Sequence, residues 1–337
     1  MTDLLWTNLC SPLCLAFALG MVARLLKSEL SLPRDLYASL SIYLLFAIGL
    51  KGGVELSHTT FKEFFAPAMV TIALGCFTPI SAYLVLRRIF RFGVADAAGI
   101  AAHYGSVSAV TFIAAQQFVN AMGYPAEGFM PTLLTLLEIP GIQIALTIGA
   151  ILTAREANAT EQLTSNDHEE SRSRPMSEVL HEVLTARSMI LLVGGVVLGF
   201  LMKDSGYKPV KPFFEDMFKG ALTLFLLDMG LAAGSRLKDL FKAGPALVAF
   251  GTLMPLIHGA LGACLGAWAG LSIGGTTVLA TMAASASYIA APPAVRMTLP
   301  QANPTYYLTA ALAITFPFNL IVGIPIYMSI ARWACGA

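Results

Sequence analysis

The chain has 337 residues, of which 56% are hydrophobic and only 12% are charged. Because soluble globular domains carry about 25% charged residues, this composition excludes a soluble protein and indicates an integral membrane protein. The formal net charge of +1 gives no reason to expect nucleic-acid binding. The five cysteines form neither a CxxC pair nor a metal-ligand spacing, so we expect them to pack among apolar residues.

A membrane-spanning helix needs about 20 mostly apolar residues. Ten segments qualify, which predicts an all-α integral membrane protein with ten transmembrane helices. They are residues 9–26, 34–51, 64–86, 95–119, 130–153, 188–203, 213–235, 243–269, 272–294 and 304–331. The N-terminus has no Lys or Arg before Arg24, so it lacks the positive region of a cleavable signal peptide, and we expect residues 9–26 to form the first span.

Residues 154–187 are polar and charged and cannot bury enough apolar surface to fold alone. We predict a flexible linker there, with a short helix at 176–187. This linker divides the chain into a first five-helix repeat, residues 1–153, and a second, residues 188–337. Similar motifs recur in the two halves in the same order, among them Pro79 with Pro255 and Glu138 with Thr315. Because five is an odd number of spans, the second repeat is expected to be inverted in the membrane.

The distribution of Lys and Arg between the loops predicts the orientation. With the N-terminus outside, 14 of these residues lie on the inner side and 7 on the outer side. We therefore expect a multi-pass protein of the inner (plasma) membrane, with both termini outside and the linker 154–187 in the cytoplasm.

Two runs of small and hydroxyl-bearing residues lie deep in apolar sequence and are expected to break the fourth and ninth helices. Breaks expose amides at helix N-termini, which carry about +0.5 of partial charge and bind anions. The alternative is tight helix packing through small residues. Pro292 and Pro293 predict a further kink near the end of the ninth helix. The predicted substrate-binding residues are Gly105, Ser106, Val107, Ser108, Ser285, Ala286 and Ser287.

Ionisable residues inside membrane spans are costly and indicate function. Glu138 and Asp228 lie within spans, and we expect coupling-cation ligation or proton relay, with structural pairing as the alternative. His258 is expected to be a hydrogen-bonded core residue, and His103 adjoins the first break. The chain has no nucleotide-binding GxxxxGK[ST] loop and no GxSxG motif, which argues against a pump ATPase and a hydrolase, so we expect no enzyme.

Several motifs resemble the SbtA-type sodium-dependent bicarbonate transporters known from cyanobacteria, and the resemblance runs from about residue 36 to 331. They include residues 48–53, 105–108, 283–293 and 299–304. The resemblance implies two inverted five-helix repeats, a scaffold and a moving core, a homotrimer, and sodium-coupled bicarbonate uptake by an elevator-like movement. It also implies a regulatory protein of the PII type on the cytoplasmic face. No cofactor is expected other than sodium as the coupling ion.

This chain departs from the cyanobacterial pattern at the second motif, where Tyr288 replaces an acidic residue and Ala290 replaces a hydroxyl-bearing one. Sodium prefers oxygen ligands, and these replacements remove candidate ligands together with one negative charge. Another residue would have to supply that charge. We hypothesise that Asp228 and Glu138 supply it. The predicted cation-coupling residues are Thr111, Glu138, Asp228 and Tyr288.

The predicted function is a secondary active transporter that imports bicarbonate by sodium symport with elevator-like alternating access. The alternative keeps the fold but makes it a proton-coupled or exchange carrier of another small anion or carboxylate, which Asp228 and Tyr288 favour. A membrane sensor or binding scaffold, with output through the linker, is a third class. The linker in this sequence is short and carries no fused signalling domain, and both features argue against a sensor.

Overall fold

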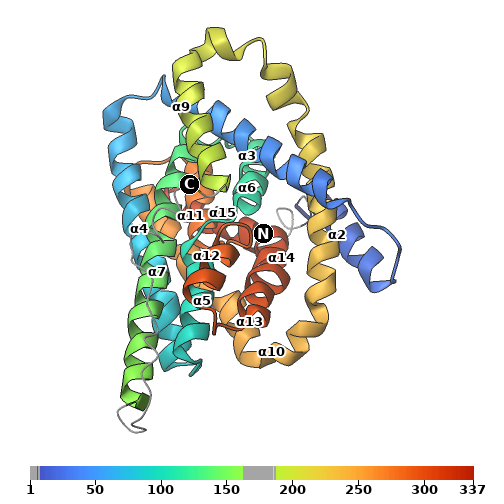
Figure 1. The fold of residues 1–337 in the computed structure, drawn as a ribbon. Coiled ribbons are helices and arrows are strands. Elements are labelled where there is room, and N and C mark those ends of the chain that lie inside the picture. Colours follow the sequence, from blue (N-terminus) through green and yellow to red (C-terminus); the bar gives the residue numbers. More distant parts are fainter. Residues whose placement is uncertain (1–5, 7, 162–184, 186) are drawn as a thin grey trace.

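The computed structural model describes residues 6, 8–161, 185 and 187–337 (Figure 1). Within these residues the chain is helical and has no strand. Eight helices are long and apolar enough to cross a membrane. They are Asp35–Leu56, Phe61–Arg88, Val94–Ala121, Met130–Glu156, Ile190–Tyr207, Pro212–Leu237, Gly244–Trp268 and Pro304–Ala334. The remaining two predicted spans contain shorter apolar helices, so the count of ten spans stays a prediction.

Within the described residues, the first half of the chain forms six helices. Side chains cap several of their N-termini: Ser11 accepts a hydrogen bond from the backbone of Cys14, and Thr60 forms a capping box with Glu63. The helices are α2 (Pro12–Leu25), α3 (Arg34–Leu56), α4 (Phe61–Arg88), α5 (Val94–Gly105), α6 (Ala109–Ala121) and α7 (Met130–Glu161).

The second half begins with α9 and ends in a helix that runs from residue 304 to 334. The helix α10 contains two of the predicted spans and bends at Gly244, whose φ of 81° takes it out of the helical region. The elements are α9 (Arg187–Tyr207), η1 (Pro212–Asp216), α10 (Phe218–Trp268), α11 (Ile273–Ala283), α12 (Ala291–Thr298), α13 (Pro304–Leu308), η2 (Thr309–Thr315), α14 (Phe316–Phe318), η3 (Asn319–Gly323) and α15 (Ile324–Ala334).

Two helix ends differ from the expected ones. The helix α7 continues to Glu161, beyond residue 153, the predicted end of the fifth span. Most of the predicted linker, including most of the short helix predicted at 176–187, lies outside the described residues. Pro292 adds no further kink, because it stands in the first turn of α12, where the missing N–H removes no intrahelical hydrogen bond.

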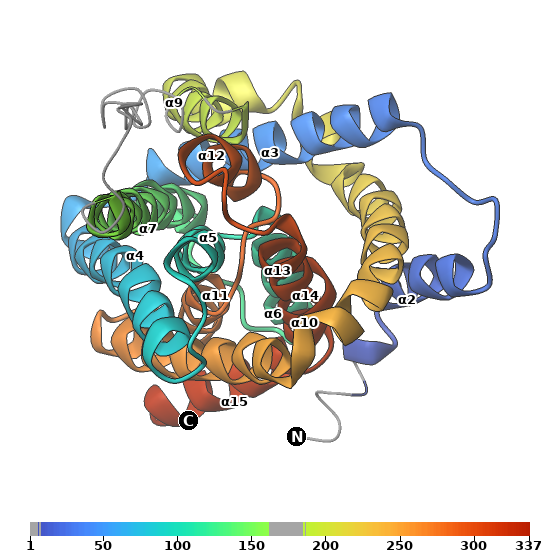
Figure 2. The ribbon, with the colours of Figure 1, turned by 60° about the horizontal axis from the view of Figure 1, so that its bottom comes forward.

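The broken helices lie in the interior of the molecule. In Figure 2, α5, α6, α11 and α13 occupy the middle of the view, and the longer helices surround them. The helix α3 packs along α9, and α2 packs along the first part of α10. These two helix pairs lie beside the central elements rather than among them (Figure 2).

Glycines set the distance within both of these outer helix pairs. A Cβ atom added at Gly20 or Gly230 would lie 2.0 Å from a backbone oxygen of the facing helix, in the α2–α10 pair. The same distance, 2.0 Å, applies to Gly53 and Gly199 in the α3–α9 pair. Small residues therefore allow backbone-to-backbone contact, as is common between helices in membranes.

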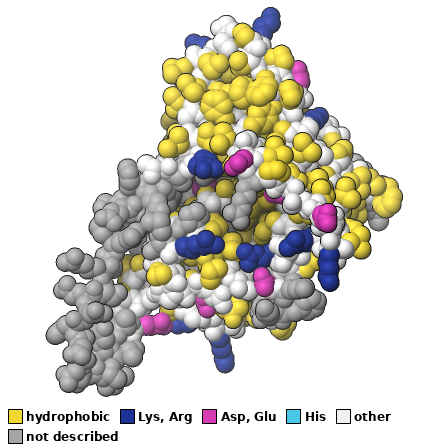
Figure 3. All heavy atoms as spheres, turned by 45° about the vertical axis from the view of Figure 1, so that its right-hand side comes forward, with side chains coloured by type: hydrophobic (Ala, Val, Ile, Leu, Met, Phe, Trp, Pro, Cys, Tyr) yellow, Lys and Arg dark blue, Asp and Glu magenta, His cyan; other side chains and the backbone are white. Residues whose placement is uncertain are grey.

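The outer surface carries many large apolar side chains. Leu15, Leu19 and Val22 are exposed on α2, and Val197 and Leu201 are exposed on α9. Hydrophobic side chains cover much of the face in Figure 3, while several Lys and Arg side chains gather near its middle. Because soluble proteins rarely expose such large contiguous apolar surface, this surface fits contact with lipid.

Candidate functional site

The first predicted helix break is confirmed. The helix α5 ends at Gly105 and α6 begins at Ala109, and Ser106 between them has extended backbone angles of φ −102° and ψ 149°. Ser108 caps α6, because its Oγ accepts a hydrogen bond from the N–H of Thr111 at 3.2 Å. The hydroxyl thus replaces one of the partners that the interrupted helix has lost.

The second predicted break is confirmed as well, and it is longer. The helix α11 ends at Ala283 and α12 begins at Ala291. Ser285 Oγ donates to the carbonyl of Met282 at 2.9 Å, and Ser287 Oγ accepts from the N–H of Ala290 at 3.3 Å. Serine hydroxyls therefore satisfy backbone groups at both ends of this interruption.

The two breaks are hydrogen-bonded to each other. The N–H of Ser108 donates to Ser285 Oγ at 3.0 Å, and the N–H of Ser287 donates to the carbonyl of His103 at 2.8 Å. All four residues are buried. Because buried amides need partners, each break supplies what the other lacks, and the two interruptions form one structural unit.

A carboxylate lies beside this unit. Ser106 Oγ donates to Glu138 Oε1 at 3.1 Å, and Glu138 is only 4% exposed. The helix α7 approaches the end of α5 so closely that a Cβ atom at Gly141 would lie 1.7 Å from the carbonyl oxygen of Gly105. This backbone contact, one turn from Glu138, positions the carboxylate next to the first break.

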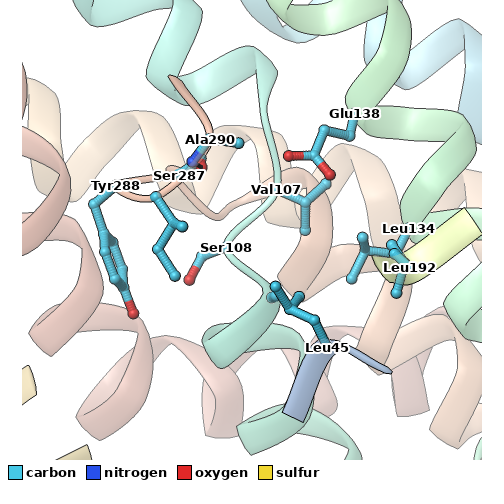
Figure 4. Close-up of a pocket in the computed structure, with 11 residues that line it drawn as sticks. Leu45, Val107, Ser108, Leu134, Glu138, Leu192, Ser287, Tyr288 and Ala290 are labelled. Carbon is cyan, nitrogen blue, oxygen red and sulfur yellow. Dashed lines mark hydrogen bonds between the residues drawn. The ribbon is translucent and has the colours of Figure 1, made fainter. Parts of the chain in front are cut away.

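A pocket opens where the two breaks, α7 and the outer helices meet (Figure 4). It holds about 350 Å³ of space that no atom occupies, part of which is open. Glu138 is the one ionisable carboxylate among its lining residues, and Lys and Arg are absent from that lining. The lining consists of Leu45, Val107, Ser108, Ala109, Leu134, Glu138, Leu192, Ser287, Tyr288, Ile289 and Ala290.

The N-termini of two helices open on this pocket. Ser108 is the N-cap residue of α6 and Ala290 is the N-cap residue of α12, and both line the pocket. Amides at helix N-termini carry partial positive charge and bind anions. The hydroxyls of Ser108 and Ser287 add neutral hydrogen-bonding groups. The arrangement can therefore hold a small anion without a basic side chain.

The predicted substrate-binding residues divide into two groups. Val107, Ser108 and Ser287 line the pocket, whereas the other four lie in or next to the breaks but outside the lining. Those four residues, all buried, are Gly105, Ser106, Ser285 and Ala286.

The predicted cation-coupling residues are not all brought together. Glu138 and Tyr288 line the pocket, and Thr111 is buried in the first turn of α6. The Tyr288 ring packs against Phe316 at a centroid distance of 5.3 Å, and its hydroxyl is buried without a hydrogen-bond partner among the described residues. Asp228 is half-buried on α10 and does not line the pocket.

Two histidines buried in the described part of the chain lie outside the pocket lining. His103 Nδ1 lies 2.7 Å from the carbonyl of Gly99, and its ring stacks on Tyr307 with centroids 4.6 Å apart. His258 Nε2 lies 2.7 Å from Ser81 Oγ, which places it in the core with one nitrogen bonded, while its Nδ1 has no partner among the described residues. These contacts are structural.

Asn319 is a site residue that no sequence motif predicted. This fully buried residue donates from Nδ2 to the carbonyl of Ala284 at 2.8 Å and accepts from the hydroxyl of Tyr327 at 2.7 Å. It thereby holds the end of α11 at the second break. Its polar amide side chain inside an apolar span could have indicated it, just as the carboxyl group inside a span indicated Glu138. The apolar lining residues Leu45 and Leu192 gave no signal, because apolar residues fill every span.

A buried pocket between two interrupted apolar helices is the arrangement of a substrate site in a membrane transporter. Residues 12–332 of the 337 match the family described as the Na⁺-dependent bicarbonate transporter superfamily. The chain therefore belongs to this family and is a membrane transporter, not an enzyme. Membership implies sodium-dependent transport of bicarbonate. The comparison with curated proteins gave no significant match.

Proposed function

We propose that this protein imports bicarbonate by sodium symport and that the anion binds between the two helix breaks. The observation that carries this proposal is the hydrogen bond from Ser108 to Ser285, which holds the N-termini of α6 and α12 at one pocket. Bicarbonate is small, planar and rich in acceptor oxygens. Backbone amides in the first turn of α6 and the hydroxyls of Ser108 and Ser287 are donors that suit it. The first turn of α12 contains Pro292 and Pro293, which have no N–H, so it contributes mainly the partial positive charge of a helix N-terminus.

The coupling ion binds on the Glu138 side of the pocket. An unneutralised carboxylate there opposes anion binding: two unit charges about 6 Å apart repel by roughly 3 kcal/mol at an effective dielectric constant of about 20. A sodium ion at Glu138 removes this repulsion, so each ion favours the other's binding. The hydroxyl of Thr111 offers a further oxygen, and the hydroxyl of Tyr288 offers one across the pocket from Glu138 (Figure 4). Asp228 lies outside the pocket lining and is not part of this site.

The proposed architecture is ten transmembrane helices in two inverted five-helix repeats, residues 1–153 and 188–337. Two contacts support it, because Ser81–His258 and Ser108–Ser285 each join residues 177 positions apart. This separation is close to that of the matched motifs, and contacts between residues near their counterparts are expected where a pseudo-two-fold axis passes between the repeats. The matched glycine contacts of the two outer helix pairs give the same support.

We further propose an elevator-like movement. The breaks are bonded to each other, whereas Leu45 of α3 and Leu192 of α9 face them only across the pocket. The hydrogen-bonded unit can slide as one body against these apolar side chains without breaking polar contacts. The resemblance to the cyanobacterial proteins adds a homotrimer and a PII-type regulatory partner. The distribution of Lys and Arg adds an inner-membrane location with both termini outside and residues 154–187 in the cytoplasm.

The second candidate is a proton-coupled or exchange carrier of another small anion or carboxylate. Glu138 favours it, since a carboxyl group in a pocket without basic residues can take up a proton in place of sodium. Tyr288 favours it too, because it stands where the similar cyanobacterial proteins carry an acid.

Uptake of labelled bicarbonate into proteoliposomes that contain the purified protein tests the proposal. The assay compares an inward sodium gradient with a choline replacement at constant pH. Uptake that collapses in choline supports sodium symport. Uptake that persists in choline but follows an imposed proton gradient supports the second candidate, and no bicarbonate uptake under any gradient rejects bicarbonate as the substrate.

A further inference from the structure

Two carboxylates outside the pocket join the broken helices to each other. Glu127, in the loop after α6, accepts a hydrogen bond from the N–H of Ser272 at 2.6 Å, just before α11. Asp96, in the first turn of α5, accepts from the N–H of Asn303 at 2.7 Å, in the loop after α12. Each contact thus connects the start of one broken helix with the loop that follows the other.

The Glu127 contact completes a helix cap from a distant part of the chain. Ser272 is the N-cap residue of α11, and its Oγ accepts from the N–H of Gly275 at 3.1 Å. In an ordinary capping box, a Glu at the position of Gly275 would accept from the N–H of Ser272. A Cβ atom at Gly275 would lie 1.7 Å from Glu127 Oε2, so Glu127 takes the place of the side chain that Gly275 lacks.

The backbone around Glu127 fits the start of α11 closely. A Cβ atom at Gly274 would lie 2.2 Å from the carbonyl oxygen of Tyr124, so the loop rests directly on the first turn of the helix. Arg332 of α15 donates to the hydroxyl of Tyr124 at 2.7 Å and lies 5.0 Å from the centre of its ring. Glu127 therefore lies where the loop after α6 packs against the first turn of α11, which restricts the movement of its side chain.

The contact of Asp96 resembles that of Glu127, because Asp96 also accepts a hydrogen bond from the N–H of an N-cap residue. Asn303 is the N-cap residue of α13, and its side chain accepts from the N–H of Thr305 at 2.9 Å. As at Ser272, the N–H of the capping residue is left for a carboxylate from the other broken helix. Asp96 lies near the start of the 28-residue segment Val94–Ala121 and Glu127 lies in the loop after its end, with the contact between the breaks in the middle of the segment.

We propose that Glu127 and Asp96 are positioning residues that hold the two broken helices together at both ends and so fix the spacing of the two N-termini at the pocket. The proposal rests on the proposed function, because it assumes that bicarbonate binds between those N-termini. A simpler role would be a local one, in which each carboxylate only stabilises the first turn of the helix that it caps.

These two roles, positioning and local stabilisation, can be separated by replacing the cap from Glu127 with a cap from within α11. The variant Glu127→Ala removes the carboxylate, and Glu127→Ala/Gly275→Glu restores a capping box within α11 without the connection to the α6–α7 loop. We expect the single variant to raise the bicarbonate KM by about fivefold, the factor that corresponds to one cap of about 1 kcal/mol. The double variant should regain the Tm of the wild type but keep the raised KM.

Recovery of both Tm and KM in the double variant would overturn the proposal and leave Glu127 as a local cap. An unchanged KM in Glu127→Ala would overturn it too. Glu127→Gln keeps an acceptor oxygen and is expected to behave like the wild type. The matched control is Glu63→Ala, which removes a capping box that lies wholly within α4 and should lower Tm without raising KM.

Hydrogen exchange gives a readout that does not depend on the substrate. Glu127→Ala should speed amide exchange in both the loop 122–129 and the helix 273–283, and the double variant should restore only the helix. If the wild type takes up no bicarbonate, the proposed function fails, yet this exchange pattern still tests the connection. Should Glu127→Ala not fold, Asp96→Ala tests the opposite contact, with faster exchange expected in residues 94–105 and 299–303.

Discussion

The N–H of Ser108 donates a hydrogen bond to Ser285 Oγ at 3.0 Å across a separation of 177 residues. The same separation recurs in the contact between Ser81 and His258, outside the pocket. Both contacts join the first half of the chain to the second. For Ser108 and Ser285, the consequence is that two helix breaks, each costly in an apolar environment, satisfy one another and form one pocket.

Removal of this contact is expected to weaken bicarbonate binding. Ser285→Ala leaves the buried N–H of Ser108 without its partner, which costs about 1–3 kcal/mol. Since 1.4 kcal/mol corresponds to about tenfold in affinity, we expect the bicarbonate KM to rise by roughly fivefold or more in the proteoliposome assay. Ser81→Ala is the control: it should lower the Tm but leave the KM unchanged, and equal effects of both variants on KM would contradict the prediction.

Replacement of Glu138 by Gln is expected to uncouple bicarbonate binding from sodium. The amide keeps an acceptor for the Ser106 hydroxyl but carries no charge, so it neither repels the anion nor attracts the cation. Binding of labelled bicarbonate to the purified variant, with and without sodium, checks this. We expect the variant to bind bicarbonate equally in sodium and in choline, whereas the wild type binds it only in sodium.

Asp228→Asn provides the comparison for Glu138. Asp228 is half-buried and lies outside the pocket lining, so its variant should retain stimulation by sodium. The opposite pattern, with sodium dependence lost in Asp228→Asn and kept in Glu138→Gln, would assign the coupling charge to Asp228.

The hydroxyl of Tyr288 is expected to contribute to sodium binding. It is buried and has no hydrogen-bond partner among the described residues, and an unpartnered buried oxygen suits a cation ligand. Tyr288→Phe should therefore raise the sodium concentration for half-maximal uptake severalfold, while Tyr288→Asp should lower it. Tyr307→Phe removes another unpartnered hydroxyl outside the pocket lining and should leave that concentration unchanged. An unchanged value in Tyr288→Phe would exclude this residue from the cation site.

The close approach of α5 and α7 predicts a strong effect of one methyl group. In Gly141→Ala the new Cβ would lie 1.7 Å from the carbonyl oxygen of Gly105, so the helices have to separate. Overpacking of this kind costs about 1–3 kcal/mol, and we expect a lower Tm together with altered sodium dependence, because Glu138 moves away from the break. Gly194→Ala, which meets no atom within 4 Å, should be neutral, and a neutral Gly141→Ala would contradict the close contact.

The sequence by itself determined the class of protein and the position of the breaks. Low charge and long apolar segments require a membrane environment, and hydroxyl-bearing residues such as Ser108 and Ser285 are conspicuous because polar groups are rare in such segments. Glu138 was identifiable for the same reason. The orientation, the ten spans and the inverted repeat remain predictions from charge and pattern.

Only the tertiary structure decided which of these residues meet. Sequence placed Glu138 and Asp228 on equal terms, but α7 carries Glu138 to the break and α10 leaves Asp228 outside the pocket lining. The distant cap from Glu127 to Ser272 was equally invisible. Local sequence reports the polarity and helical period of a segment, whereas contacts between segments depend on how the helices pack, which small residues such as Gly141 permit without any distinctive pattern of their own.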